Sequence, residues 1–232
     1  MKFKFPLLPI ECSISKAHKP INTTIEKTYN KVFAIGLGKT GTSSLAKFFQ
    51  TVGLKLGNQT IGELLTEEVA DGKLERLFKL CETADAFQDL PFMMDVYQEL
   101  DLKFPNSKFI LTERDSPEQW YRSLTQFHTK KFSSDKDSLP TKEDLAKSHY
   151  LYKGWALESF GWFWDYPNVA LYDEEYYKEK YSDYNASVSK YFLGRENDFI
   201  RINVSKQNDF GVLCDFLNIK TEMTALPWEN KT

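Results

Sequence analysis

The chain has 232 residues, of which 41% are hydrophobic and 15% aromatic, so it can bury a sizeable core and is not expected to be disordered over most of its length. A formal net charge of −3 gives no global reason to expect binding to nucleic acid or to a membrane surface. Any anion site must therefore come from a local placement of lysine and arginine.

The N-terminal segment lacks the features of a signal peptide. Residues 1–13, MKFKFPLLPIECS, begin charged and are interrupted by Pro6 and Pro9, so they contain no sustained apolar stretch. No part of the chain approaches the length of a membrane span. The three cysteines, Cys12, Cys81 and Cys214, have neither the spacing of a disulfide framework nor that of a zinc site. These features predict a soluble, cytoplasmic protein with an N-terminal arm at residues 1–30 and a single domain at residues 31–232.

Apolar runs alternate along the chain with segments of helical periodicity. The clearest run is residues 31–37, which is nearly all apolar, as a central parallel strand buried on both faces should be. This alternation predicts an α/β fold with a mainly parallel sheet. The other expected strands are residues 84–88, 108–112 and 199–204. The expected helices are residues 42–52, 61–69, 73–82, 93–102, 117–128, 174–192 and 210–217. An aromatic, partly helical segment is expected at 145–164 and a mobile polar loop at 130–141.

The stretch VFAIGLGKTGTSSLAKFF, at residues 32–49, runs from the first strand through a glycine-rich loop into a helix. Such a loop builds a cradle for an oxyanion, because backbone N–H groups at a helix N-terminus point toward the bound group. Nucleotide-hydrolysing P-loops read G-x-x-x-x-G-K-[ST]. Gly36 and Gly41 have that separation, but Thr42 takes the lysine position and Lys39 lies inside the loop. The sequence thus predicts a site for a phosphate-like group that differs from an ordinary ATPase loop.

Two other interpretations of the loop are a plain packing turn and a dinucleotide fingerprint. The pattern G-x-G-x-x-G is matched by Gly36, Gly38 and Gly41. However, no acidic residue ends a second strand at the distance that the fingerprint requires. We therefore favour anion binding.

Three strand ends carry residues that suit such a site. Ligands of open parallel sheets bind outside the carboxyl ends of the strands. The first expected strand ends in the loop at residues 36–44, the second at Asp89, and the third at Arg114, with Ser123 about two turns into the next helix. If these strands are neighbours, a cation-lined anion cleft and one carboxylate meet at one edge of the sheet.

These segments resemble the sulfotransferase family that uses 3′-phosphoadenosine 5′-phosphosulfate, in a distant, bacterial-type branch. GLGKTGTSSL is similar to the family's 5′-phosphosulfate loop, K-[TS]-G-T-[TS], and ILTERDSPEQWYRSL resembles its 3′-phosphate motif. FIRINVSKQNDFGVLCDFLNI and the closing Leu-Pro-Trp-Glu-Asn-Lys resemble its late strand-to-helix segment. The resemblance extends from about Lys31 to the C-terminus. It implies a three-layer, P-loop NTPase-like α/β fold.

The resemblance also implies a donor and its binding residues. Loop amides would cradle the 5′-phosphate, Lys39 would reach the oxygen between phosphorus and sulfur, and Arg114 with Ser123 would hold the 3′-phosphate. No metal is required, because Lys39 and backbone donors supply the electrostatics. The expected donor-binding residues are Gly38, Lys39, Thr40, Gly41, Thr42, Ser43, Ser44, Arg114 and Ser123.

The reaction needs a base to take a proton from the acceptor hydroxyl. In the string Gln88-Asp89-Leu90-Pro91, Asp89 stands where several cytosolic sulfotransferases place a histidine before Leu-Pro. The competing interpretation of Asp89 is a cap for a helix that starts near Pro91. The alternative bases are the three histidines, His18, His128 and His149, each of which we expect to be solvated. Lys39 and Asp89 are therefore the expected catalytic residues.

Some features depart from the family pattern. Ser44 and Leu45 follow the loop where cytosolic members place a tryptophan that stacks on adenine, and the late arginine-lysine-glycine motif has no clear counterpart. The spacing from Arg114 to Ser123 is one residue longer than in the best-known branch. The competing functions are therefore a P-loop kinase that uses ATP and Mg²⁺ and a non-catalytic nucleotide-binding protein of the same fold.

The acceptor is the least defined part of the prediction. The expectation is a small molecule, glycan or lipid that carries a hydroxyl or amine, with no nucleic acid partner, and the oligomeric state is left open. An aromatic set could line an acceptor pocket, but such sets more often form a core, so we assign it to the core. Its members are Trp155, Phe160, Trp162, Phe163 and Trp164.

Overall fold

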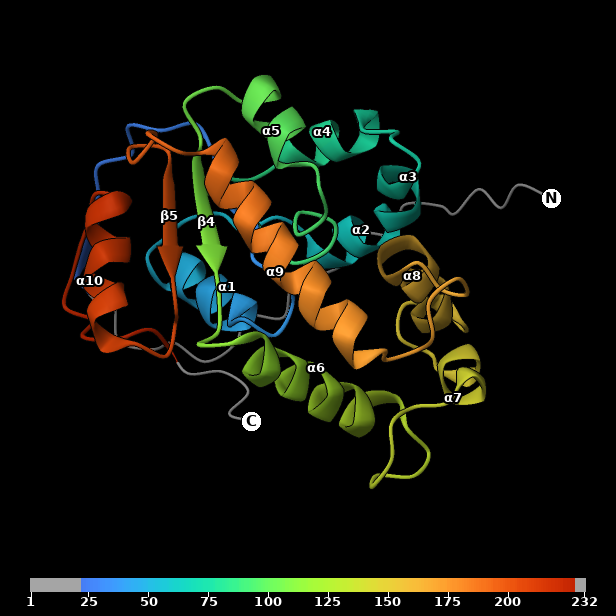
Figure 1. The fold of residues 1–232 in the computed structure, drawn as a ribbon. Coiled ribbons are helices and arrows are strands. Elements are labelled where there is room, and N and C mark those ends of the chain that lie inside the picture. The colour runs from blue at the N-terminus through green and yellow to red at the C-terminus, as the bar shows by residue number, and fades with distance from the viewer. Residues whose placement is uncertain (1–21, 228–232) are drawn as a thin grey trace.

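The computed structural model describes residues 22–227, which are built around a four-stranded parallel sheet with the order β3-β2-β4-β5 (Figure 1). The strands are β2 (Val32–Ala34), β3 (Ala86–Gln88), β4 (Lys108–Thr112) and β5 (Phe199–Ile202). Every neighbouring pair in this sheet is parallel. The expected three-layer, P-loop NTPase-like α/β fold is confirmed.

Each face of the sheet buries its own hydrophobic core. Val32 and Ala34 of β2 pack on one side, and Phe33, between them, packs on the other. This alternation follows from the two-residue side-chain period of a strand. The first core is closed by α1 (Thr42–Thr51) and α10 (Gln207–Phe216). The second is closed by α3 (Thr66–Ala70), α4 (Glu75–Cys81), α5 (Tyr97–Lys103), α6 (Pro117–Phe132), α8 (Trp155–Trp164) and α9 (Glu174–Tyr191).

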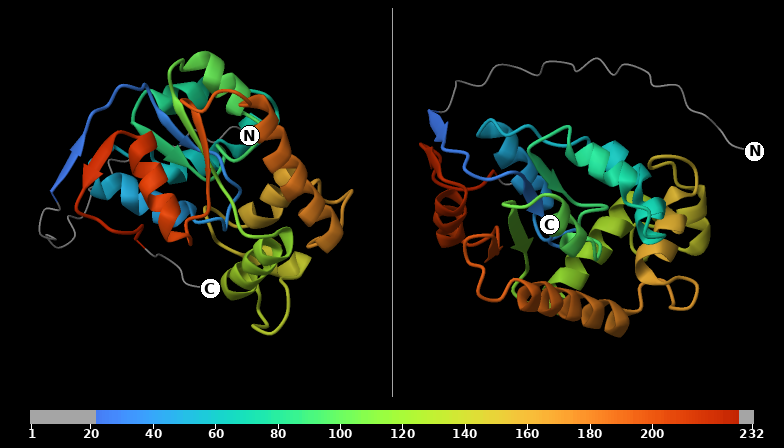
Figure 2. Two further views of the ribbon diagram at one scale, coloured as in Figure 1. Left: turned by 60° about the vertical axis from the view of Figure 1, so that its left-hand side comes forward. Right: turned by 90° about the horizontal axis from the view of Figure 1, so that it is seen from above.

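A second, two-stranded sheet pairs β1 (Thr23–Ile25) with β6 (Ile219–Thr221) in antiparallel fashion at the edge of the molecule (Figure 2). The sequence did not predict either strand. Each is three residues long, and its partner lies at the other end of the chain, so local periodicity carries no signal for the pair. The described part of the expected N-terminal arm therefore contains a strand.

Several helix boundaries differ from the expected ones. α6 continues to Phe132, so its last turn includes the first residues of the segment expected to be a loop; Phe132 packs there against His128 and Tyr150. The single helix expected at 61–69 is divided into α2 (Gln59–Leu64) and α3. α7 (Lys142–Lys147) begins with a capping box formed by Thr141 and Asp144.

Two observations concern the expected cellular setting. Among residues 22–227, no helix combines the length and apolar character needed to cross a bilayer. Cys81 and Cys214 are buried free thiols, while Cys12 lies outside the described residues.

The close approach of β2 and β4 depends on a glycine. A Cβ atom at Gly36 would lie 2.6 Å from the backbone nitrogen of Thr112 and closer still to its two oxygens. Because Thr112 belongs to a central strand, its backbone cannot move aside. We expect Gly36→Ala to lower the free energy of unfolding by about 2 to 3 kcal/mol in urea denaturation.

The matched control is Gly211→Ala in α10, where nothing lies within 4 Å of the added methyl group. Alanine should raise stability there by about 0.5 to 1 kcal/mol, since glycine is a poor helix former. Equal stabilities for Gly36→Ala and the wild type would show that the strands can separate without cost.

Candidate active site

The carboxyl ends of β2, β3 and β4 meet at a cavity of about 280 Å³. Because β2 lies between β3 and β4, Lys39, Asp89 and Arg114 all reach this cavity, each from the segment that follows one strand. The remaining wall comes from α2, α6, α8, the segment that follows Asp89 and the segment before α8. The structure thus brings together the three strand ends that the sequence singled out.

The loop between β2 and α1, residues 36–41, is here called the glycine loop. Its backbone carbonyl oxygens are bound by other parts of the protein: the indole nitrogen of Trp120 donates to the Gly38 oxygen at 3.0 Å, and Nε of Arg114 donates to the Lys39 oxygen at 2.8 Å. These carbonyl oxygens would repel an anion if they faced it. The bonds from Trp120 and Arg114 hold them in place on the protein side.

Two residues of the glycine loop have left-handed backbone conformations, Lys39 with φ of 72° and Gly41 with φ of 110°. Left-handed residues allow a loop to turn backbone N–H groups toward a bound anion. Within this loop, the N–H of Gly38 donates to the sulfur of Met93 at 3.1 Å and that of Thr40 to the Leu37 oxygen at 3.3 Å, so any anion cradle is formed by the N–H groups that follow. A Cβ atom at Gly41 would lie 3.0 Å from Cγ1 of Val204 and closer still to Cγ2, so only glycine fits. α1 begins at the next residue and adds the positive end of its dipole.

The loop residues divide into two groups. Thr40 is completely buried, and its hydroxyl bonds to the Leu37 carbonyl oxygen at 2.6 Å and to the Thr112 hydroxyl at 2.5 Å. Ser44 is also buried and does not line the cavity. Both side chains thus lie in the packing beneath the loop. The loop and helix residues that line the cavity are Leu37, Gly38, Lys39, Gly41, Thr42 and Ser43.

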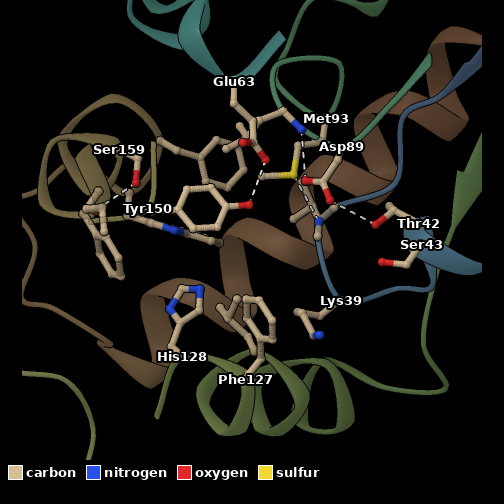
Figure 3. A pocket seen from close by; sticks show the side chains of 18 of the residues that line it. Lys39, Thr42, Ser43, Glu63, Asp89, Met93, Phe127, His128, Tyr150 and Ser159 are labelled. Carbon is tan, nitrogen blue, oxygen red and sulfur yellow. Dashed lines mark hydrogen bonds between the residues drawn. The ribbon is translucent and has the colours of Figure 1, made fainter. Parts of the chain in front are cut away.

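The side chain of Lys39 extends into the cavity with its ammonium nitrogen 3.9 Å from the centre of the Phe127 ring, and Asp89 lies across the space (Figure 3). A cation over an aromatic face is favourable. Burial lowers the pKa of Lys39, and the attraction of Asp89 opposes that shift. Among residues 22–227, Lys39 is the lysine that lines the cavity.

Asp89 is held by its two carboxylate oxygens. One accepts a hydrogen bond from the Thr42 hydroxyl at 3.1 Å, and the other accepts from the Leu90 amide at 3.0 Å. Burial raises the pKa of Asp89, which makes its carboxylate a stronger base. The cap interpretation does not fit, since residues 91–96 form turns and α5 begins only at Tyr97.

Arg114 and Ser123 have different surroundings. Arg114 lines the cavity, and its terminal Nη groups have no hydrogen-bond acceptor among residues 22–227. Ser123 is buried in α6 and does not line the cavity; its hydroxyl likewise has no partner in the described part of the chain. The structure therefore leaves a bidentate cation facing the cavity and a second unpaired donor on the adjoining helix.

Sequence reasoning missed one carboxyl group in the cavity wall. Glu63 of α2 is 8% exposed; it accepts hydrogen bonds from the Tyr150 hydroxyl at 3.1 Å and from Gln59 at 3.3 Å. Burial, and secondarily the charge of Asp89, raises the pKa of Glu63 to about 7. No motif surrounds Glu63 in the sequence. The helix also buries Glu63 while it exposes the apolar side chains of Ile61 and Leu64, which is the reverse of what the residue types suggest.

The histidines are not placed as expected. His128 lines the cavity instead of being solvated, with Nδ1 3.2 Å from the Tyr172 hydroxyl. Burial and the charge of Lys39 lower the pKa of His128 to about 3, so it is neutral at physiological pH and a weak base. His149 does not line the cavity, and His18 lies outside the described residues.

The aromatic set assigned to the core is both core and cavity wall. Its members Trp155, Phe160, Phe163 and Trp164 are buried and also line the cavity, whereas Trp162 does not line it. The assignment to the core alone was therefore incomplete. Among residues 22–227, no group of three or more histidine, cysteine or acidic side chains is arranged to hold a metal ion.

The raised pKa of Glu63 predicts a specific pH dependence of stability. Folding favours the protonated carboxyl, so the wild type loses stability as the pH rises from the ordinary glutamate range through about 7. We expect Glu63→Gln to match the wild type near pH 5 and to be more stable by on the order of 2 kcal/mol near pH 8. Thermal unfolding across this range measures the difference.

The control for that measurement is Glu67→Gln, the same chemical change on an exposed side chain of α3. Its stability should follow the wild type at every pH. A constant offset between Glu63→Gln and the wild type from pH 5 to 8 would contradict the shifted pKa.

Comparison with known proteins agrees with this geometry. A family model described as a sulfotransferase domain matches residues 31–232, which cover the whole parallel sheet and every residue of the cavity. A search of curated proteins found no match. The chain belongs to the sulfotransferase family, and the protein is a sulfotransferase.

Proposed function

We propose that the protein transfers a sulfuryl group from 3′-phosphoadenosine 5′-phosphosulfate to the hydroxyl of a small acceptor bound in the cavity. The observation that carries this proposal is that Lys39, on the glycine loop, and Asp89 both line one cavity (Figure 3). The ammonium group and the carboxylate are the two groups that sulfuryl transfer requires, one for the leaving oxygen and one for the attacking hydroxyl.

The donor is anionic at both ends, and the site offers separate groups for each. The glycine loop and the first turn of α1, with Thr42 and Ser43, suit the 5′-phosphate. Arg114 suits the 3′-phosphate, because its free Nη groups can bind two oxygens at once. The hydroxyl of Ser123, also expected at this phosphate, has no partner among the described residues but is buried and does not line the cavity, so the proposed 3′-phosphate contact depends on Arg114.

In the proposed reaction the acceptor oxygen attacks sulfur in line with the bond that breaks. Asp89 takes the hydroxyl proton as the new oxygen–sulfur bond forms. Lys39 stabilises the negative charge that grows on the bridging oxygen as the bond from sulfur to that oxygen breaks. The electron pair of the broken bond remains on the departing 5′-phosphate, and the acceptor leaves as a sulfate ester. Thr42 holds the Asp89 carboxylate next to the loop throughout.

The choice of donor predicts a pattern of nucleotide binding. Calorimetric titration should show tight binding of 3′-phosphoadenosine 5′-phosphate and weaker binding of adenosine 5′-phosphate, which lacks the 3′-phosphate. Arg114→Lys should reduce the ratio of these two affinities by about tenfold or more, since lysine cannot form the bidentate contact. Arg114 also binds the Lys39 carbonyl oxygen, so its loss could weaken the binding of both nucleotides through the loop. The ratio of the two affinities cancels that shared effect and reports the contact with the 3′-phosphate.

Arg122→Lys, on the exposed side of α6, is the matched control and should leave the ratio unchanged. Tight binding of ATP with Mg²⁺ and no binding of the bisphosphate would favour a P-loop kinase instead. Binding of the bisphosphate without turnover of any acceptor would favour a non-catalytic protein of this fold.

If Asp89 and Lys39 have the proposed catalytic roles, changing either one should lower kcat and leave the binding of the nucleotide product intact. Asp89→Asn keeps the left-handed backbone and the bond from Leu90, so we expect it to bind 3′-phosphoadenosine 5′-phosphate normally and to lose roughly 10²-fold or more in kcat. Lys39→Met should behave alike, because it removes the ammonium group but keeps a long side chain over Phe127. Turnover is measured with a panel of phenols and alcohols.

Asp71→Asn, which changes only an exposed ion pair with Lys73, serves as the control for these variants. Near wild-type turnover in Asp89→Asn would reduce Asp89 to a structural role. Normal turnover in Lys39→Met would remove the leaving-group role of Lys39.

A further inference from the structure

The cavity contains two buried carboxyl groups that form no direct salt bridge among the described residues. Glu63 and Asp89 both line it, and neither forms an ion pair with any other residue in the described part of the chain. Lys39 attracts Asp89 across the cavity, whereas Glu63 is affected more by the negative charge of Asp89 than by the positive charge of Lys131. An ionised carboxylate that is buried without a cation is costly. Such a group is stabilised when a ligand brings a positive charge to it.

Glu63 and Asp89 are held by different parts of the protein. Asp89 is tied to the first residue of α1 through Thr42, whereas Glu63 comes from α2 and is tied to Tyr150 on the opposite wall (Figure 3). In the proposed reaction Asp89 receives the hydroxyl proton. Glu63 takes no part in that step and is free to bind another part of the acceptor.

Aromatic rings surround the Glu63 end of the cavity. Tyr150 stacks on Trp155 with 5.1 Å between ring centres, and Phe132 contacts Tyr150 edge to face. The indole N–H of Trp155 is buried and has no hydrogen-bond acceptor among residues 22–227. Aromatic faces beside a carboxylate favour an organic cation.

The positive charges of the cavity lie elsewhere. Lys39 and Arg114 belong to the donor end, and His128 is neutral at physiological pH. Lys131 does not line the cavity, but it lies 5.1 Å from the centre of the Tyr150 ring, and its charge favours the ionised form of Glu63. The Glu63 end is thus acidic and aromatic, which disfavours an anionic acceptor.

Resting on the proposed function, we infer that the acceptor is a small aromatic alcohol that also carries a protonated amine, with its hydroxyl at Asp89 and its ammonium group at Glu63. The Glu63 end of the cavity, with the rings of Phe132, Tyr150 and Trp155 in its wall, suits an aromatic ring that carries a short side chain. Glu63 is then a specificity-determining residue, and the sulfuryl group goes to the oxygen because the ammonium nitrogen has no free electron pair.

The test compares three phenols that share one ring and differ at the far end of the side chain: tyramine, 4-ethylphenol and 3-(4-hydroxyphenyl)propionate. Each is titrated calorimetrically into the full chain saturated with 3′-phosphoadenosine 5′-phosphate at pH 8. Tyramine should bind at least about tenfold more tightly than 4-ethylphenol, and the propionate should bind least tightly. Glu63→Gln should bring the ratio of the tyramine and 4-ethylphenol affinities to about one, while Glu67→Gln should leave it unchanged.

The preference for tyramine should also grow between pH 6 and 8. Over this range Glu63 ionises, since its pKa is about 7 in a setting formed by Gln59, Asp89, Lys131 and Tyr150. The amine of tyramine stays protonated and the affinity of 4-ethylphenol should change little. If the ratio of the tyramine and 4-ethylphenol affinities did not change between pH 6 and 8, the charge of Glu63 would have no role in binding the amine.

Equal affinities for tyramine and 4-ethylphenol, or no binding of either, would overturn the inference. An equal loss of both affinities in Glu63→Gln would show that Glu63 only supports the fold of the wall. The binding of 3′-phosphoadenosine 5′-phosphate tests the proposed function separately from these outcomes. If the bisphosphate binds and the amine preference is absent, only this inference fails; if the bisphosphate does not bind, the proposed function fails.

Discussion

Side chains from three different elements bind the carbonyl oxygens at the end of β2 and in the glycine loop. Trp120 of α6 binds the Gly38 oxygen, Arg114 after β4 binds the Lys39 oxygen, and Tyr184 of α9 binds the Ile35 oxygen at 2.7 Å. A carbonyl oxygen left facing the cavity would oppose an anion. These bonds therefore fix the polarity of the loop before any ligand arrives, and they make anion binding depend on the packing of α6 and α9 against the sheet.

The same packing divides the cavity into two electrostatic ends. α6 contributes Trp120 to the loop and Phe127 to the surface under the Lys39 ammonium group. It contributes Phe132 to the aromatic wall near Tyr150. One helix thus orders the cationic end and the acidic, aromatic end together. The length of α6 matters because Phe132 lies in its last turn. A helix that ended at residue 128, as the sequence suggested, would leave the acidic, aromatic end of the cavity without part of its wall.

The sequence predicted what local patterns encode and missed what depends on distant contacts. Asp89 and Arg114 could be found because each follows an apolar run that reads as a strand, and parallel strands align their carboxyl ends. Glu63, Trp120 and Tyr184 carry no comparable signal, since their roles arise from helices that pack onto the loop from elsewhere in the chain. The same limit applies to β1 and β6, which are short and defined only by each other.

Burial shifts Lys39 and Asp89 toward their neutral forms, lowering the pKa of one and raising that of the other, while their mutual attraction opposes both shifts. An anionic donor at the loop changes this balance in a definite direction. Its negative charge favours the ammonium form of Lys39 and raises the pKa of Asp89 further. In the proposed reaction, arrival of the donor therefore strengthens the base and secures the charge that the leaving oxygen needs. The donor and the hydroxyl acceptor are then coupled through two residues that already face each other across the cavity.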